Sequence, residues 1–309
     1  MSGTTVHILL ATYNGARFLR EQLDSIAVQV HNDWTLTISD DGSTDETLAI
    51  ASDFANSAQQ PVQLICSPGL GPTQNFFYLL QQVSSSASND LFAFCDQDDV
   101  WQPMKLARAV QWHANQEVET PRLYCSRTQY VDQFLRPLGE SPYLKRPASF
   151  SNALVQNIAS GNTMVMNKLV LQGMRQIQPK HSVWHDWTTY LAATAMGGVV
   201  GFDDNPSVLY RQHDANVVGS NRGFSAQVRR LAPVWNGRFK QWTNTNLGAM
   251  RDLDQLVCND AAQCISELER MRSASSILER MRLFSQSNIR RQGSLSNASL
   301  IAALMTNRI

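Results

Sequence analysis

The chain has 309 residues, of which 43% are hydrophobic and 17% are charged, and its acidic and basic residues cancel to a net charge of zero. A chain of this length and composition can bury a full core, which excludes a largely disordered protein. The five cysteines lack zinc-type spacing, and no signal-peptide pattern or apolar run of roughly 18 residues is present. We therefore expect reduced thiols and a cytoplasmic protein, with at most a peripheral membrane contact.

Four apolar segments near the N-terminus have the length of buried strands, and segments with helical spacing separate them. The strands are expected at residues 6–11, 34–39, 62–66 and 91–95, and the helices at about residues 17–28, 44–54 and 75–82. Ser43 or Thr44 is placed to cap the second helix. This alternation predicts a mostly parallel sheet with crossover helices, in which ligands bind outside the carboxyl ends of the strands.

The later part of the chain changes from a mixed pattern to a helical one. Strands are expected at residues 122–131 and 161–166, an extended segment at residues 197–210, and a helix at residues 182–195 that starts near His185. After about residue 224, apolar residues recur at helical spacing. We therefore predict an α/β domain at residues 1–220 and a helical C-terminal extension at residues 221–309.

These two parts carry opposite net charges. Up to Ser220 the chain has 13 basic and 20 acidic residues, whereas from Asn221 onward it has 13 basic and 6 acidic residues. Such asymmetry suggests different partners for the two parts. The carboxylates of the first part would repel nucleic acid phosphates, so we expect no binding of DNA or RNA.

Three carboxylates, Asp96, Asp98 and Asp99, fall within four positions directly after the strand expected at residues 91–95. They repel one another unless a divalent cation sits among them. Hard oxygen ligands suit Mg²⁺ or Mn²⁺, which often bind between carboxylates and the phosphates of a nucleotide. A solvated acidic loop is the alternative. The buried strand before the carboxylates, with Trp101 and Pro103 after them, favours the cation site.

Asp40 and Asp41 end the strand expected at residues 34–39. A turn followed by a helix cap is the simpler interpretation of this pair. In the functional interpretation, one carboxylate accepts hydrogen bonds from a nucleobase N–H or a ribose hydroxyl. Both roles can coexist because there are two aspartates.

Two further pairs follow in the second half of the predicted domain. His185 and Asp186 precede a helix, where they can cap it, or Asp186 can act as a general base on an acceptor hydroxyl. Arg211 can bind a diphosphate bidentately, and His213 can be a metal ligand or a hydrogen-bond partner of phosphate. A surface loop is the alternative for this second pair.

Four motifs stand in one order along the chain: ATYNG near the N-terminus, DDGSTD, DQDDVW, and HDW with YRQH after it. Together they resemble the family 2 glycosyltransferases of the GT-A fold, and among them the rhamnosyltransferase-like enzymes of bacterial surface polysaccharide assembly. The resemblance covers about residues 4–220. It implies a Rossmann-like nucleotide-diphosphosugar transferase sheet, a nucleotide-activated sugar donor, and inversion of the anomeric carbon in a single displacement.

The resemblance also implies roles for individual residues. The nucleotide-sugar contacts fall on Thr12, Tyr13, Asn14, Asp40, Asp41, Asn75, Asp96, Asp98, Asp99 and Arg211. Asp41 matches the position that binds the base edge, and Asp99 orients the acceptor or the sugar. Asp98 is expected on the metal, with Asp96 and His213 as further ligands. Asp186 matches the catalytic base, although many relatives carry Glu-Asp at the position of its His-Asp pair.

The implied partners are a dTDP- or UDP-sugar and a glycan or lipid-linked glycan acceptor. The basic, helical tail suits contact with anionic lipid, or it packs on the catalytic domain or forms a homodimer. A sugar nucleotidyltransferase and a non-catalytic nucleotide-sugar-binding module are the alternatives. The first normally has a Gly-rich, basic loop after its first strand, where this chain has ATYNG. The intact carboxylates Asp96, Asp98 and Asp186 argue against the second.

Overall fold

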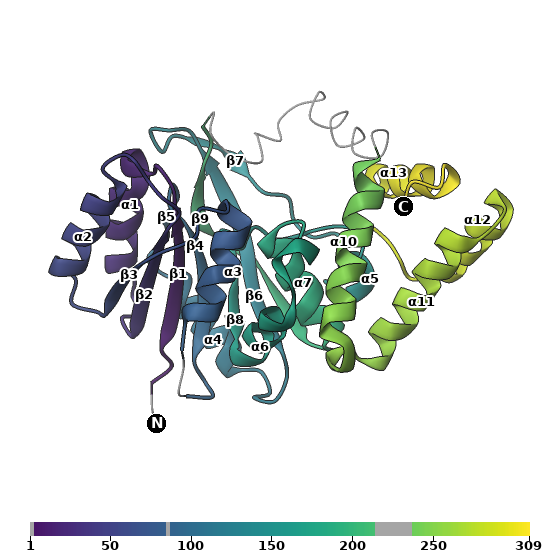
Figure 1. Cartoon of the computed structure of the whole chain (residues 1–309), viewed down its shortest axis with the longest axis horizontal. Coiled ribbons are helices and arrows are strands. Elements are labelled where there is room, and N and C mark those ends of the chain that lie inside the picture. The colour runs from purple at the N-terminus through teal and green to yellow at the C-terminus, as the bar shows by residue number, and fades with distance from the viewer. Residues whose placement is uncertain (1–2, 85–86, 214–236) are drawn as a thin grey trace.

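A computed structural model describes residues 3–84, 87–213 and 237–309 (Figure 1). One mixed sheet has the strand order β3-β2-β1-β4-β8-β6-β9-β5, and β7 pairs with β6. The strands are β1 Val6–Thr12, β2 Trp34–Asp40, β3 Val62–Cys66, β4 Leu91–Asp96, β5 Val100–Trp101, β6 Arg122–Val131, β7 Pro137–Glu140, β8 Val165–Asn167 and β9 Val199–Arg211.

Helices cover both faces of this sheet and continue beyond it. They are α1 Ala16–Ala27, α2 Thr47–Ser57, α3 Pro72–Gln82, α4 Lys105–Ala114, α5 Phe150–Ala153, α6 Lys168–Gln176, α7 His185–Ala195, α10 Arg238–Leu253, α11 Asn259–Ser273, α12 Ile277–Gln286 and α13 Ser294–Met305, with short 3-10 turns at η1 Gly161–Thr163, η2 Pro179–His181 and η3 Asp254–Leu256. The predicted α/β fold class with a helical C-terminal region is therefore confirmed.

The parallel part of the sheet brings three polar strand ends together. β3, β2, β1 and β4 are parallel neighbours, and the register pairs Thr12 with Asp40 and Ala11 with Asp96. The remaining strands are mixed, since β8 runs antiparallel to both β4 and β6 while β9 is parallel to β6. The predicted parallel arrangement therefore holds for the first four strands. The ends of these strands carry polar residues of the site.

Alternate residues of the central strands enter two separate cores. Ile8 and Leu10 of β1 pack with α1, α2 and α4, whereas Leu9 packs with the helices of the other face, and all three are fully buried. Burial of such a side chain contributes about 1.5–3 kcal/mol. In Figure 1, α1 and α2 lie on one side of the sheet and α3, α6 and α7 on the other. The sheet is therefore a rigid platform for the loops at its edge.

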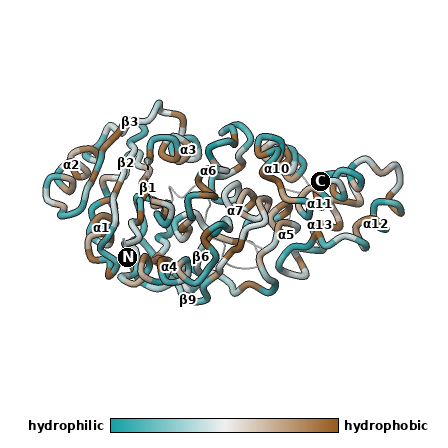
Figure 2. Tube along the Cα trace, turned by 90° about the horizontal axis from the view of Figure 1, so that it is seen from below, coloured by the Kyte–Doolittle hydropathy of each residue, from teal (hydrophilic) through white to brown (hydrophobic). Residues whose placement is uncertain are grey.

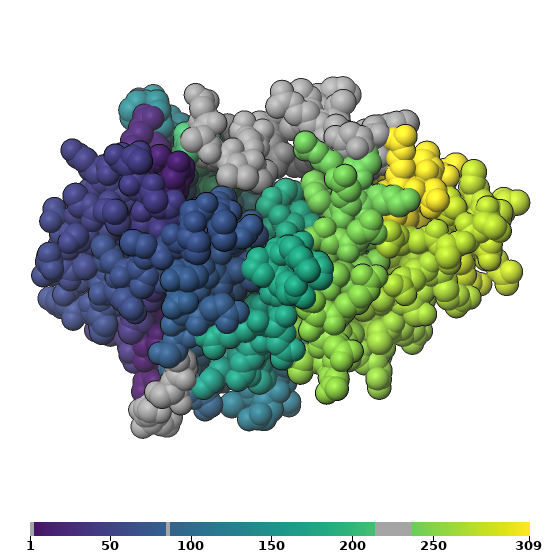
Figure 3. Space-filling model, viewed as in Figure 1, coloured from purple at the N-terminus to yellow at the C-terminus, as the bar shows by residue number. Residues whose placement is uncertain are grey.

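The C-terminal helices extend the hydrophobic core on the face of the sheet that α3, α6 and α7 cover. They do not form a core of their own. Leu247 and Met250 of α10 and Leu268 of α11 belong to the same hydrophobic cluster as Tyr190 and Leu191 of α7. Figure 2 places α11–α13 at the end of the molecule opposite α1 and α2, and Figure 3 shows them packed continuously against the rest. The predicted division between residues 220 and 221 lies outside the described residues.

Arginines of the tail satisfy main-chain carbonyls where helices end. Arg280 is 6% exposed and donates to the carbonyl oxygens of Met271 at 3.2 Å, Ala274 at 2.9 Å and Leu304 at 2.8 Å. Its charge thereby holds α11, α12 and α13 together. This arrangement favours the packing alternative for the described part of the tail. No helix of the described residues is long and apolar enough to cross a membrane.

Two helices begin at other residues than the sequence predicts. The helix expected from residue 44 begins at Thr47, because the Ser43 hydroxyl donates to Asp40 at 2.6 Å and accepts from the Asn14 N–H at 2.8 Å. Ser43 therefore orders the loop instead of capping α2. The helix expected from residue 75 begins at Pro72, whose fixed φ suits the first turn.

The strand expected at residues 161–166 is divided between η1 and β8.

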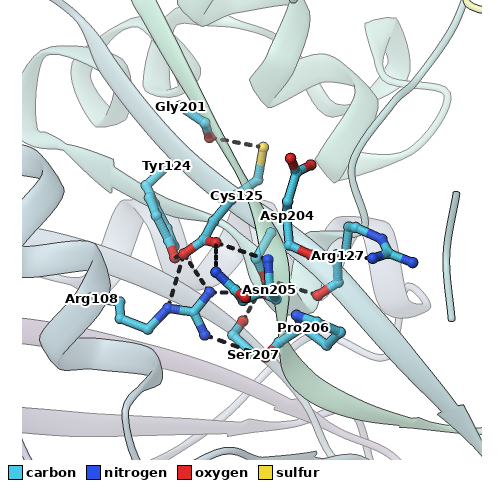
Figure 4. Close-up of polar contacts among 11 residues, drawn as sticks. Arg108, Tyr124, Cys125, Arg127, Gly201, Asp204, Asn205, Pro206 and Ser207 are labelled. Atoms are coloured by element: carbon cyan, nitrogen blue, oxygen red, sulfur yellow. Dashed lines mark hydrogen bonds and ion pairs between the residues drawn. The ribbon is translucent and has the colours of Figure 1, made fainter. Parts of the chain in front are cut away.

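A register shift between β6 and β9 redirects the end of β9 toward the site. The shift lies between Ser126 and Thr128. Arg108 of α4 holds the strand there, donating to Asp203 and to the carbonyl oxygens of Asn205 and Pro206 (Figure 4). The Tyr124 hydroxyl donates to the same Asp203 at 2.7 Å. The following residues of β9 then run beside the loop after β4.

Candidate active site

The polar ends of β1, β2 and β4 open into a cleft that extends past α7 to the C-terminal helices. Its volume of 2290 Å³ exceeds the roughly 300–1,000 Å³ of a typical small-molecule pocket, so it has room for two substrates. Nine of the predicted residues line it: Thr12, Tyr13, Asn14, Asp41, Asn75, Asp96, Asp98, Asp186 and His213. The other three, Asp40, Asp99 and Arg211, are buried outside that lining.

The loop after β1 is held by a residue that the sequence analysis missed. The Gln97 side chain accepts from the Tyr13 N–H at 2.8 Å and donates to the Tyr13 carbonyl at 3.0 Å. Asn14 adopts a positive φ of 44°, and its side chain accepts from the Thr44 N–H at 2.8 Å. The Tyr13 side chain is thereby left 56% exposed at the cleft. The only signal for Gln97 was its position between Asp96 and Asp98.

Asp40 orders the loop between β2 and α2. One carboxylate oxygen accepts from the Thr12 hydroxyl at 2.9 Å and from the Ser43 hydroxyl. The other accepts from the N–H groups of Gly42 at 3.1 Å and Ser43 at 2.8 Å. Asp40 is 2% exposed, so these bonds occupy it fully. These bonds favour the turn interpretation of this aspartate, and its ligand contact stays a prediction.

Asp41 and Asn75 form the wall between the loops after β2 and β3. The Asp41 carboxylate accepts from the N–H groups of Gly69 at 3.1 Å and Gly71 at 2.7 Å, so it shapes the second loop while it lines the cleft. Asn75 donates to the Ser39 carbonyl at 2.8 Å, and its side-chain oxygen has no partner among the described residues. That oxygen is available for a ligand hydroxyl or N–H.

Asp98 and His213 meet across the cleft. Nε2 of His213 lies 2.8 Å from a carboxylate oxygen of Asp98, and both side chains are partly exposed. Burial, together with the negative charges of Asp98 and Asp186, raises the pKa of Asp96 to about 8. Carboxylates that raise one another's pKa form a site that favours a cation.

The predicted ligands of that cation are not assembled in advance. In the described parts of the chain, no group of three or more His, Cys, Asp or Glu side chains is already arranged to hold a metal ion. Mg²⁺ and Mn²⁺ commonly take only one or two carboxylates from the protein and the rest from phosphate oxygens and water. The donor set of Asp98, Asp96 and His213 therefore fits a cation that binds together with a diphosphate.

Asp99 and Arg211 are buried behind the Asp98–His213 pair, outside the lining of the cleft. The Asp99 carboxylate accepts from the Asn162 side chain and from the Arg211 N–H at 3.1 Å, and it is fully buried. The Arg211 guanidinium donates to the Asp98 carbonyl at 2.8 Å and to Glu21 at 2.7 Å. Its guanidinium is paired within the protein because β9 runs beside the loop after β4, and the diphosphate contact predicted for it stays a prediction.

Asp186 projects into the cleft from the first turn of α7. It accepts from the Trp187 N–H at 2.6 Å, and it also bonds to the Asn157 side chain and the Gly161 main chain. Burial raises its pKa to about 6 in spite of these bonds. At neutral pH it is therefore ionised yet more basic than an ordinary aspartate, as a general base should be. Trp184 occupies the N-cap position of α7, so the capping interpretation of the His-Asp pair is wrong.

His185 has a structural role beside this base. Its ring stacks on Phe76 with centroids 3.9 Å apart and meets the edge of Phe94 at 4.9 Å. Burial lowers its pKa to about 3, so it is neutral. A Cβ at Gly161 would collide with Nε2 of His185. The glycine and the neutral ring thus set the position of the turn that carries Asp186.

The far part of the cleft comes from residues that the sequence analysis did not single out. Trp184 and Trp242 line it together with the start of α13. Gln292, before α13, accepts from the N–H groups of Lys145 at 3.0 Å and Arg146 at 2.9 Å, and donates to the Arg146 carbonyl at 3.0 Å. It joins the tail to the loop after β7. These residues are scattered along the chain, so no local pattern could reveal them.

Solved structures with the same architecture define the class of protein. S. aureus TarS 1–349 in complex with UDP-GlcNAc matches with a TM-score of 0.56 at 14% identity, covering 99% of this chain and 90% of that one. A mannosyltransferase from Pyrobaculum calidifontis in complex with GDP-Man and Mn²⁺ matches with a TM-score of 0.51 at 16% identity, covering 98% and 86%. At these identities the likeness shows the fold alone, which is the GT-A glycosyltransferase fold.

Sequence relatives then place the chain more closely. The profile described as "Glycosyl transferase family 2" matches residues 7–170. The dTDP-rhamnosyl transferase RfbG of Shigella flexneri is 30% identical over 81% of this chain and 87% of its own length. An uncharacterized glycosyltransferase of Nostoc sp., alr2836, is 25% identical over 68% of this chain and 66% of its own. The chain belongs to glycosyl transferase family 2, and it is a glycosyltransferase.

Proposed function

We propose that this enzyme transfers rhamnose from dTDP-rhamnose to a glycan acceptor with inversion at the anomeric carbon, and that it requires Mg²⁺ or Mn²⁺. The observation that carries this proposal is the placement of Asp186 and of the Asp98–His213 pair in one cleft with room for two substrates. The similarity to a dTDP-rhamnosyl transferase over most of the chain supports rhamnose as the sugar.

The donor occupies the end of the cleft formed by the loops after β1, β2 and β3. Tyr13 offers an exposed aromatic ring to the base, and Asp41 and the free oxygen of Asn75 offer acceptors for N–H and hydroxyl groups. Asp98, with Asp96 and His213, would hold the divalent cation. When bound, that cation supplies positive charge that offsets the charge of the diphosphate.

Asp186 activates the acceptor. Its ionised carboxylate takes the proton of an acceptor hydroxyl while that oxygen attacks the anomeric carbon from the face opposite the diphosphate. The new C–O bond forms as the bond to the diphosphate breaks, and dTDP leaves with the bonding electron pair. The acceptor is a glycan of cell-surface polysaccharide synthesis, either free or lipid-linked.

Calorimetry with dTDP, UDP and GDP, each with and without Mn²⁺, followed by a transfer assay with dTDP-rhamnose, tests the proposal. We expect the wild-type protein to bind dTDP tightly only when the cation is present. The affinity of Asp98→Ala for dTDP should be the same with and without the cation. Asp53→Ala, the same substitution on the exposed face of α2, is the matched control. Metal-independent binding of dTDP would refute the cation site, and turnover of another nucleotide sugar alone would refute rhamnose.

A further inference from the structure

Three tryptophans from two helices meet beside the catalytic base. The ring centroids of Trp184 and Trp242 are 5.2 Å apart, and both lie about equally far from Trp187, at 6.0 and 5.9 Å. Trp187 is 3% exposed and donates from Nε1 to the Ala153 carbonyl at 2.6 Å, so it forms the floor of the cluster. Trp184 and Trp242 are half-buried and line the cleft.

The position of this cluster separates it from the donor site. Trp184 is two residues before Asp186, at the N-cap of α7, whereas Tyr13 and Asp41 lie at the ends of β1 and β2. Trp242 comes from the second turn of α10, on the side of the C-terminal helices. Trp184, Trp242 and Asp186 line one cleft, so a molecule resting on the two tryptophans shares that cleft with the base.

The opposite wall is built from small and hydroxyl-bearing residues. Gly293, Ser294, Leu295, Ser296, Ala298 and Ser299 at the start of α13 line the cleft. Arg291 is held by the Ser299 hydroxyl at 3.0 Å, and its guanidinium lies 5.2 Å from the centre of the Phe239 ring. The wall thus leaves space and offers hydrogen-bonding groups.

An aromatic floor facing a hydroxyl-bearing wall matches the chemistry of a pyranose. One face of such a ring presents C–H groups that pack on an aromatic surface, while its hydroxyls point outward from the rim and need polar partners. We propose that Trp184 and Trp242 form the binding site for the terminal sugar of the acceptor and thereby hold its hydroxyl at Asp186. This inference rests on the proposed function, and it assigns the acceptor end of the same cleft.

Methyl glycosides of common hexoses, 6-deoxyhexoses and N-acetylhexosamines serve as acceptor probes for the full-length protein with dTDP and Mn²⁺ present. Binding is measured by saturation-transfer NMR, and the acceptor KM and donor KM by release of dTDP. We expect Trp242→Leu and Trp184→Leu each to weaken glycoside binding and raise the acceptor KM about tenfold, with the donor KM nearly unchanged. Trp242→Phe, which retains an aromatic face, should keep most of the affinity.

Trp112→Leu is the matched control, because Trp112 is half-buried on α4 and packs against Gly201. Thermal unfolding of every variant separates loss of the fold from loss of binding. Unchanged glycoside affinity in folded Trp184→Leu and Trp242→Leu would overturn the inference, and so would binding of inorganic phosphate but of no glycoside. Failure of the wild-type protein to bind dTDP would instead overturn the proposed function.

Discussion

The two ends of the cleft are built in different ways. The donor end consists of loops after parallel strands, where charged side chains are mostly bonded to the main chain of the same loops, as Asp40 and Asp41 are. The acceptor end consists of aromatic and small residues from α7, α10 and α13, which meet only in the folded chain. Polar motif residues therefore do not all line the cleft, because several of them shape the loops around those that do.

This contrast divides the aspartates of the sequence motifs by task. Asp40 and Asp99 are buried and bonded to the protein, whereas Asp98 and Asp186 face the cleft. The first pair should affect stability and the second pair chemistry. Substitutions at the two ends of the cleft test this division.

The largest effect is expected for Asp186→Asn. The amide cannot accept a proton, so the transfer rate should fall by about 10³-fold, within the range for loss of a general base. Donor affinity should persist because the substitution is nearly isosteric and Asp186 is not among the proposed ligands of the donor or the cation. Steady-state kinetics and calorimetry with dTDP measure both, with Asp53→Asn as the control. Full activity in Asp186→Asn would show that another group is the base.

Arg211→Met tests whether a buried motif arginine acts on structure or on the donor. Glu21 and the carbonyls of Asp98 and Gln133 would lose a charged donor, so the free energy of unfolding should fall by about 3 kcal/mol. Urea denaturation measures it. Arg20→Met, in an exposed pair with Asp24, should leave the stability unchanged. Unchanged stability with a large loss of dTDP affinity in Arg211→Met would show that Arg211 contacts the diphosphate.

Asp41→Ala should affect both stability and donor binding. The N–H groups of Gly69, Leu70 and Gly71 would lose their acceptor, which costs about 2 kcal/mol and loosens the loop that walls the donor end. Thermal unfolding and the donor KM measure the two effects, and the acceptor KM is the internal control. A raised acceptor KM with an unchanged donor KM would contradict the division of the cleft.

The pH dependence of kcat/KM should report the ionisation of Asp186. Burial raises its pKa to about 6, and only the deprotonated carboxylate can take the hydroxyl proton. The rate should therefore be constant above this pKa and fall about tenfold for each pH unit below it. Rate profiles at saturating cation measure this. A fall in kcat/KM that begins only near pH 4 would mean that the surroundings of Asp186 do not raise its pKa.

The smallest effect is expected for Gln292→Ala at the acceptor end. Its hydrogen bonds fix the loop after β7 against the tail, so stability should fall by about 1 kcal/mol and the acceptor KM should rise a few-fold. Gln263→Ala, on the exposed face of α11, is the control. If the donor KM rose instead, the tail would have to reach the donor end.

Regular elements with strong periodicity could be predicted from the sequence, whereas their exact starts could not. The four parallel strands of the first 100 residues are where their apolar runs indicate, and in β1, β2 and β4 most residues are buried because both faces of these inner strands are covered. The start of α2 differs because Ser43 bonds to Asp40 and Asn14 instead of capping the helix. A hydrogen bond to another loop outweighed the local capping preference.

The sequence by itself determined the class of fold, the family and the set of polar residues at the strand ends, because each depends on local patterns and on their order. Only the tertiary structure decided which of those residues reach the cleft. Arg211 and Asp99 are separated by 112 positions, and their contact depends on the pairing of β9 with β6 and β5. The acceptor end likewise exists only because α10 packs on α7 and α13 packs on α12 to line the same cleft, which no segment of the sequence specifies alone.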